Sequence, residues 1–389
     1  MNLALKDIRY NVMRFALTGC GIGFLMVAAI GMVGLYRGIV ADALLIIDNI
    51  GADLWVVQGE RDGPFAEGSS VSSTMDRRVA GIEGVVSARR FVQFSQQFGY
   101  GGTRHRATIT GLDYPQDAGR WFPLAAGRRM QTGHFEAVAD ASIGLPLGAT
   151  VRLAKDDYTV VGLTHELVDS AGDGLLFVSV NDATAIASRR PSEQVLLARA
   201  AGGTADAVAT DPSQSSVAQE SKIAAVLVRL APNADPARVR AAIGRWGDAN
   251  VLSQAQQRDL LLNQRLWRLR IQILAFTAVL LLVTSIVVAL IIYTLTMEKL
   301  HQIALLKLIG ARNGVIVSMI LQQAALIGIS GFALAVLLAH LVFPHFPRRI
   351  VILASDLGVL FTILCVLCTL ASWFGIARAL KVRAQEVLA

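Results

Sequence analysis

Few residues in this sequence have the types and spacing that chemistry requires. Cys365 and Cys368 have the spacing of a metal-binding or redox pair, but they lie inside an apolar stretch without a second pair. His165-Glu166 begins like the helix of a zinc protease, yet no second histidine follows four residues later. Residues 99–106 (GYGGTRHR) combine glycines with basic residues, and we interpret them as a hairpin loop. These patterns favour packing and solvated surface over catalysis.

Two common enzymatic motifs are also absent from the sequence. No GxxxxGK[ST] segment occurs, so the chain is not expected to hydrolyse ATP by the P-loop route. No G-x-S-x-G nucleophile elbow occurs either. We therefore expect no catalytic, cofactor-binding or metal-ligating residue in this chain.

The composition indicates a membrane protein. Hydrophobic residues make up 54% of the 389 residues and charged residues 17%, whereas soluble domains carry about 25% charged residues. The net charge of +7 is modest for this length and requires no nucleic-acid partner. Three cysteines exclude a disulfide scaffold.

Four long windows contain no Asp, Glu, Lys or Arg. They cover residues 15–36, 271–297, 313–347 and 357–377. Because about 20 apolar residues span a bilayer as a helix, we expect four transmembrane helices. The first window could also be a signal peptide, with Ala41-Asp42-Ala43 resembling a cleavage site, but it exceeds the usual apolar length of about 7–15 residues. Lys and Arg near the helix ends favour a cytoplasmic N-terminus by a small margin.

The long insert after the first span has the pattern of a mixed α/β domain. A helix is expected over 237–246, with Asp235 as its cap. We expect a hairpin turn over 155–158 and mobile loops over 61–74 and 200–221. Short runs rich in β-branched and aromatic residues predict strands at 52–57, 107–111, 150–153, 158–162, 175–180 and 224–230.

The segment before the second span predicts a stalk. No Gly or Pro occurs between Ser253 and Gly310, so one helix is expected over 253–297, extending about 67 Å at 1.5 Å per residue. The stalk has apolar surface that needs a packing partner, formed by residues 260, 262, 266, 267 and 269. We expect residues 38–50 to cover this surface.

Four glycines of the first span occur in pairs with small-xxx-small spacing. They are Gly19 with Gly23, and Gly34 with Gly38. Such pairs allow close helix packing in lipid, although glycine is common enough in membrane helices for coincidence to remain open.

The segment after the second span carries a family resemblance. Residues 297–311 read MEKLHQIALLKLIGA and resemble the signature of FtsX-like, MacB-type ABC transporter permeases, roughly E-R-x-x-E-I-G-L-L-R-A-L-G-A. Residues 3–9 and 378–388 resemble the terminal segments of that family, and 144–151 with 158–162 resemble its external core domain. The sequence of this segment is closest to that of the DevC-type branch. Gln302 and Lys307 depart from the Glu and Arg that the family often has there.

The resemblance implies that this segment is a coupling helix for a separate ATPase. Its apolar positions recur at helical spacing between basic residues, and such a helix could fill a groove on a partner or lie at the lipid interface. The coupling residues that the resemblance implies are Glu298, Lys299, Gln302, Ile303, Leu305, Leu306, Lys307, Ile309, Gly310 and Ala311.

The fold that the resemblance implies is an α-helical four-span transmembrane bundle with a large inserted α/β periplasmic domain on a helical stalk. The expected order is a cytoplasmic amphipathic helix (1–14), transmembrane helix 1 (15–40), the periplasmic domain (41–252), the stalk continuing into transmembrane helix 2 (253–297), the coupling helix (298–312), transmembrane helix 3 (313–343), a periplasmic turn (344–356), transmembrane helix 4 (357–377) and a cytoplasmic tail (378–389).

The implied function is that of a permease subunit in the bacterial inner membrane, with both termini cytoplasmic. The expected partners are an ABC ATPase that binds the ATP, a second copy of the chain, a periplasmic membrane fusion protein, an outer-membrane channel and membrane lipid. By mechanotransmission, ATP hydrolysis would drive export of a lipid, glycolipid or other amphiphile. Lipoprotein release, FtsX-like regulation of a cell-wall hydrolase and ligand sensing remain open alternatives.

Overall fold

The computed structural model describes residues 12–189, 222–298, 313–346 and 348–381. The chain divides into two compact units. The first unit contains the chain up to Gly38 and from Arg268 onward, and the second contains Ile39–Trp267.

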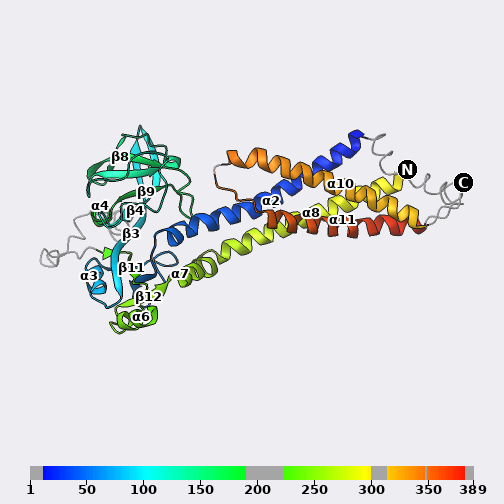
Figure 1. The fold of residues 1–389 in the computed structure, drawn as a ribbon. Coiled ribbons are helices and arrows are strands. Elements are labelled where there is room, and N and C mark those ends of the chain that lie inside the picture. Colours follow the sequence, from blue (N-terminus) through cyan, green and yellow to red (C-terminus); the bar gives the residue numbers. More distant parts are fainter. Residues whose placement is uncertain (1–11, 190–221, 299–312, 347, 382–389) are drawn as a thin grey trace, which may run out of the picture. The chain divides into compact units, whose positions relative to one another are not determined.

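Helices build the first unit, and the described residues contain four that are long and apolar enough to cross a membrane. This confirms the four predicted spans. Apolar side chains from all four helices meet in one buried cluster that includes Met26, Val288, Ile320 and Leu364. The helices are α2 (Val12–Asn49), α8 (Trp267–Glu298), α10 (Asn313–Val342) and α11 (Ala354–Lys381), with the short 3-10 helix η4 (Phe343–His345) after α10 (Figure 1).

The second unit is built on a sheet of ten strands among the described residues, in the order β12-β1-β11-β3-β4-β9-β6-β8-β5, with β7 paired to β8. The pairs β4–β9 and β6–β8 are parallel and the others antiparallel. A separate small sheet pairs β10 with β2. The strands are β1 (Leu54–Gln58), β2 (Val71–Ser72), β3 (Val85–Tyr100), β4 (Thr103–Leu112), β5 (Ala126–Gly127), β6 (Glu136–Asp140), β7 (Thr150–Leu153), β8 (Asp156–Thr164), β9 (Leu175–Ser179), β10 (Lys222–Ile223), β11 (Ala225–Leu230) and β12 (Ala249–Ser253).

One long strand, β3, joins the two halves of this sheet (Figure 1). Its first half pairs with β11, where Arg89 lies opposite Leu227, and its second half pairs with β4, where Phe94 lies opposite Ile109. β3 is not among the strands that the sequence predicts. Its link to β4 is the tight turn Gly101-Gly102, with both φ angles positive as such two-residue hairpins require. The expected hairpin over 99–106 is therefore confirmed.

Short helices flank the sheet. They are α3 (Met75–Ala80), α4 (Val180–Ser188), α6 (Pro236–Gly244) and the 3-10 helix η1 (Ala141–Ile143). The predicted cap of α6 is confirmed, because Asp235 accepts a hydrogen bond from the Ala237 amide at 2.9 Å and Pro236 opens the helix. The predicted turn over 155–158 is displaced, because Leu153 pairs directly with Asp156 and only Ala154 and Lys155 lie between the strands.

Residues 61–70 have no regular secondary structure, as the loop prediction expected, but specific contacts anchor the segment. Phe65 is buried and its ring packs edge-on against Trp55, with centroids 5.3 Å apart. The Asn250 side chain donates to the Arg61 carbonyl at 3.1 Å, and residues 71–72 form β2. A single aromatic anchor therefore fixes a segment whose glycines and serines give no sequence signal. The other predicted mobile loop, 200–221, lies outside the described residues.

The predicted stalk is not one continuous helix. It consists of α7 (Gln254–Leu260), the π-helical segment η3 (Leu261–Arg265) and then α8, with Leu266 between the last two. The Leu266 amide donates to the Leu261 carbonyl at 2.9 Å, which is a π-type bond across five residues. No Gly or Pro marks this interruption, so residue type alone could not predict it.

Candidate functional site

The predicted coupling residues lie almost entirely outside the described part of the chain. Glu298 is the last residue of α8 and is exposed. The remaining predicted coupling residues, which lie outside the described residues, are Lys299, Gln302, Ile303, Leu305, Leu306, Lys307, Ile309, Gly310 and Ala311.

The first glycine pair of α2 lies against α10. A Cβ atom added to Gly23 would come 3.2 Å from the Gly331 carbonyl oxygen, and one added to Gly19 would come 3.3 Å from the Ser330 hydroxyl. Gly331 in turn faces Ile22 and the Gly19 carbonyl. Small residues on both helices therefore allow the two backbones to approach closely.

The second glycine pair lies against the segment between α10 and α11 rather than against a helix. A Cβ atom on Gly38 would sit 1.8 Å from the Arg349 carbonyl oxygen, and one on Gly34 would sit 2.6 Å from Ile350. The Val351 amide also donates to the Gly34 carbonyl at 3.0 Å. We call Gly34, Gly38 and residues 349–351 the glycine clasp.

An ion pair adjoins the glycine clasp. The Arg37 guanidinium donates through Nε and Nη2 to the two oxygens of Asp356, at 3.0 and 2.9 Å. This two-pronged geometry fixes direction as well as charge. It fastens α2 to the first turn of α11 within the first unit.

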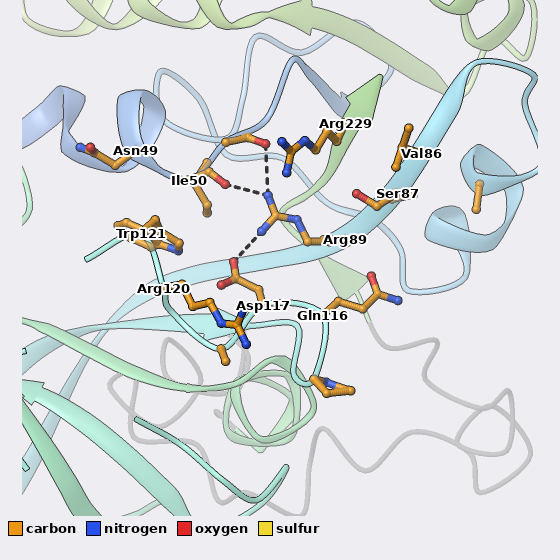
Figure 2. Close-up of a pocket in the computed structure, with 15 residues that line it drawn as sticks. Asn49, Ile50, Val86, Ser87, Arg89, Gln116, Asp117, Arg120, Trp121 and Arg229 are labelled. Carbon is orange, nitrogen blue, oxygen red and sulfur yellow. Dashed lines mark hydrogen bonds and ion pairs between the residues drawn. The ribbon is translucent and has the colours of Figure 1, made fainter. Parts of the chain in front are cut away.

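The C-terminal end of α2 is fastened by different chemistry in the second unit. Arg89 of β3 donates to the Ile50 carbonyl at 2.7 Å and to the Asp117 carboxylate at 2.7 Å (Figure 2). The two side chains are 12% and 6% exposed. A cation is favourable at a helix C-terminus, where carbonyls lack helical partners. We call Arg89, Asp117 and the Ile50 carbonyl the arginine tie.

Helix α7 also holds the last turn of α2, through residues other than the apolar stalk positions that the prediction named. The Gln254 side chain donates to the Ile47 carbonyl at 3.1 Å, and Arg258 pairs with Asp48 at 3.2 Å. Next along the chain, the Gln257 side chain donates to the Gly63 carbonyl at 2.5 Å. The end of α2 is thus bound to both the sheet and α7.

A pocket of about 780 Å³ opens beside the arginine tie (Figure 2). Its lining combines three arginines with one aspartate, an indole and several small apolar side chains. The lining residues are Asn49, Ile50, Gly51, Ala80, Val86, Ser87, Ala88, Arg89, Pro115, Gln116, Asp117, Ala118, Arg120, Trp121 and Arg229. The volume of the pocket lies within the range of small-molecule sites, about 300–1,000 Å³.

The motif candidates from the sequence do not come together. His165 is exposed, and His105 packs in the β3–β4 hairpin, where its Nδ1 lies 2.8 Å from the Ile143 carbonyl. Cys365 and Cys368 are both free thiols on α11. Within the described ranges, no three His, Cys, Asp or Glu residues gather as metal ligands would.

One carboxylate of the domain has a strongly shifted pKa. Glu136 accepts hydrogen bonds from Arg128 and from the Gln131 and Thr132 amides. These interactions, Arg128 first, lower the pKa of Glu136 from 4.5 to about 2, so its charge persists in mild acid. The cluster closes the loop before β6, away from the pocket lining.

Sequence reasoning missed the arginine tie and the pocket. Arg89 and Asp117 are 28 residues apart, and neither belongs to a recognisable motif. Only β3 and the segment after β4 bring them together, and β3 was itself not predicted. The one available signal was a pair of arginines, Arg89-Arg90, inside a run of mixed apolar and polar residues.

Comparison with known families gives two adjacent matches along the chain. The MacB-like periplasmic core domain matches residues 15–246. The FtsX-like permease C-terminal region matches residues 274–384. Together they cover both units.

Similar proteins span nearly the whole chain. An uncharacterized ABC transporter permease of Mycobacterium tuberculosis is 22% identical over 386 residues, covering 97% of this chain and 96% of its own length. A second permease with the same description from that organism is 23% identical over 385 residues, with the same coverage. Among solved structures, the periplasmic region of MacB from Actinobacillus actinomycetemcomitans covers 56% of this chain and 96% of its own, at 13% identity and a TM-score of 0.37.

Proposed function

The chain belongs to the family of MacB-type, FtsX-like ABC transporter permeases, and from this premise we propose that it works by mechanotransmission. A separate ABC ATPase binds and hydrolyses ATP, and this chain converts the cycle into motion of its periplasmic domain. Two copies of the chain face the two ATPase subunits. The motion drives export of a lipid, glycolipid or other amphiphile through a membrane fusion protein and an outer-membrane channel.

The continuity of α2 is the observation that carries this proposal. It is one unbroken helix from Val12 to Asn49, and it contributes residues to both units. The glycine clasp holds it in the first unit, and the arginine tie holds its end in the second. A helix fastened by specific contacts at two places transmits displacement along its axis.

The interruption after α7 complements this role. The π-helical segment η3 and Leu266 separate α7 from α8, so the second connection between the units is not a single rod. Such segments occur often at functional sites in helices. In our proposal α2 carries the force, while residues 261–266 bend as the chain moves.

The first test is co-purification of the ATPase. Leu306→Glu places a charge on the apolar face of the proposed coupling helix, and Leu306→Met is its matched control. We expect an ABC ATPase to co-purify from detergent-solubilised membranes with the wild type and Leu306→Met but not with Leu306→Glu. The absence of an ATPase from all three would refute the coupling assignment.

The same preparation tests the export role. We expect a membrane fusion protein to accompany the complex and to raise its ATPase turnover. A soluble lipoprotein carrier in its place would indicate lipoprotein release, and a cell-wall hydrolase would indicate regulation. Turnover that is indifferent to an added fusion protein would contradict export.

The proposed orientation places the domain outside and both termini inside. Lys155 is exposed in the β7–β8 turn, so Lys155→Cys should react with a membrane-impermeant maleimide in intact cells once the outer membrane is permeabilised. A cysteine appended to the C-terminus should react only after lysis. The unmodified chain is the control for Cys20, Cys365 and Cys368. Labelling of both sites in intact cells would contradict this orientation.

A further inference from the structure

The pocket beside the arginine tie carries an excess of positive charge. Its lining contains Arg89, Arg120 and Arg229 against the single carboxylate of Asp117, a net charge of +2. Both carboxylate oxygens of Asp117 already have hydrogen-bond donors. One accepts a hydrogen bond from Arg89, and the other accepts one from the Gly119 amide at 2.9 Å. Its charge therefore offsets Arg89 and leaves the other two arginines uncompensated.

Arg120 and Arg229 are exposed, and neither makes a side-chain hydrogen bond or ion pair within the described part of the chain. In the view of Figure 2 they flank the Arg89–Asp117 pair, with Arg229 above it and Arg120 below. Guanidinium groups bind carboxylate and phosphate oxygens with paired hydrogen bonds. Two of them around one hollow are suited to a single anionic group.

The same pocket also has apolar lining residues. The Trp121 indole packs edge-on against Phe122 and Phe177, with centroids 4.9 and 5.7 Å away, so the ring is held in place. Val86 also lines the pocket and is 63% exposed, which is a large exposed fraction for an aliphatic side chain of a strand. Ala80 and Pro115 line the pocket as well. A hydrocarbon chain that covers Val86 would gain the free energy of removing that surface from water.

We propose that this pocket binds a small amphiphile with an anionic headgroup, with Arg120 and Arg229 holding the charge and Val86 and Trp121 contacting the hydrocarbon. The concave shape and volume favour a small molecule over a docked protein, which needs a surface of about 800 Å² on each partner. The inference rests on the proposed function only in that export of an amphiphile explains why the domain meets one.

The pocket shares residues with the arginine tie, so ligand binding there affects the end of α2. Arg89 and Asp117 line the pocket, and Arg89 also donates to the Ile50 carbonyl at the end of α2. An anion drawn in by Arg120 and Arg229 lowers the positive potential around Arg89 and changes the balance that keeps this pair in place. Occupancy of the pocket is thereby linked to the helix that carries force.

Equilibrium dialysis of radiolabelled octyl phosphate tests the proposal. The probe stays below its micelle concentration, the full chain is held in nanodiscs of zwitterionic lipid, and uptake by empty nanodiscs is subtracted. We expect saturable binding that octanol does not compete for and that inorganic phosphate competes for only weakly. Equal competition by inorganic phosphate would identify a simple phosphate site and overturn the amphiphile assignment, as would the absence of saturable uptake.

Paired variants distinguish binding in the pocket from nonspecific electrostatic attraction of the probe to the chain. Arg120→Gln with Arg229→Gln should weaken binding by about tenfold or more, which is the loss of about one charge-assisted hydrogen bond. Arg120→Lys with Arg229→Lys should retain most of it. The control, Arg152→Gln with Arg245→Gln, removes the same charge from exposed positions outside the lining and should bind like the wild type. Equal loss in the control would overturn the proposal.

This assay needs no ATPase, so its outcome is distinguishable from the co-purification test. A chain that binds octyl phosphate but recruits no ATPase keeps the site and loses the proposed function. A chain that recruits the ATPase but takes up no octyl phosphate keeps the function and loses this inference.

Discussion

The glycine clasp and the arginine tie hold the same helix by opposite means. In the glycine clasp, side chains are missing, and backbone from residues 349–351 fills the space directly against α2. In the arginine tie, a long charged side chain crosses to the helix end and captures a carbonyl and a carboxylate. The first depends on volume and the second on charge.

The difference follows from the two surroundings. Gly34 and Gly38 carry no side chain, so the irregular segment 349–351 packs directly against the backbone of α2, and any added volume would overlap it. At the C-terminus of α2 the free carbonyls need a donor, and Arg89 provides it. Each fastening should therefore respond to one kind of substitution and tolerate the other.

The largest effect is expected from Arg89→Met. It leaves Asp117 charged and buried without its partner and removes the donor to Ile50, so we expect a loss of about 3–5 kcal/mol in the stability of the domain. Thermal unfolding of the full chain in detergent measures this. Adding Asp117→Asn should recover part of the loss, because the unpaired charge is then gone. A double variant no better than Arg89→Met would show that charge is not what the arginine tie supplies.

Gly38→Ala should have the next largest effect. The new methyl group would overlap the Arg349 carbonyl oxygen, and overpacking of this kind costs about 1–3 kcal/mol. Gly21→Ala is the matched control, since nothing lies within 4 Å of its added Cβ and alanine is the better helix former. We expect thermal unfolding in detergent to show a lower midpoint for Gly38→Ala only. Equal midpoints would mean that the glycine clasp tolerates volume.

Asp356→Asn tests charge beside the glycine clasp, and its effect should be smaller. Arg37 and Asp356 are 46% and 18% exposed, against 12% and 6% for the pair in the arginine tie. Exposed pairs contribute roughly 0–1 kcal/mol, so we expect a loss of about 1 kcal/mol in the same thermal assay. A loss as large as that of Arg89→Met would remove the distinction between the two fastenings.

An effect of similar size concerns the stability of the domain in acid. The folded pKa of Glu136, about 2, lies below its ordinary value of 4.5. Its stabilising contribution is therefore complete above about pH 4.5 and is lost as the pH falls toward 2. Glu136→Gln should destabilise the domain by about 1 kcal/mol near neutral pH and reduce the acid sensitivity of unfolding below about pH 4.5. Identical pH profiles for the variant and the wild type would contradict this.

The membrane helices could be predicted from the sequence, but the fastenings could not. Charge-free windows mark a span because burying a charge in lipid is costly, and that signal is local. The two halves of β3 pair with different neighbours, and its residues Gln93, Ser95, Gln96 and Gln97 break any simple alternation of apolar side chains. The pairing of Arg89 with Asp117 depends on that strand.

The contacts of the four glycines of α2 could be predicted only in part. Their spacing predicted close contact, and the structure places Gly19 and Gly23 against α10. The partner of Gly34 and Gly38 is an irregular segment beyond the third span, and no periodicity identifies such a partner. Likewise, Phe65 is one aromatic residue in a run of glycines and serines, too isolated to indicate burial.

The strand order of the domain has a consequence for how the protein is made. β1 lies between β11 and β12, and Leu54 pairs with Val228, 174 residues further along the chain. At about 5–20 residues per second, roughly 10–35 s of synthesis separate the first strand from its neighbours. During that interval β1 emerges as an unpaired edge with Trp55 uncovered, so the nascent chain has to be shielded from aggregation until its last two strands arrive.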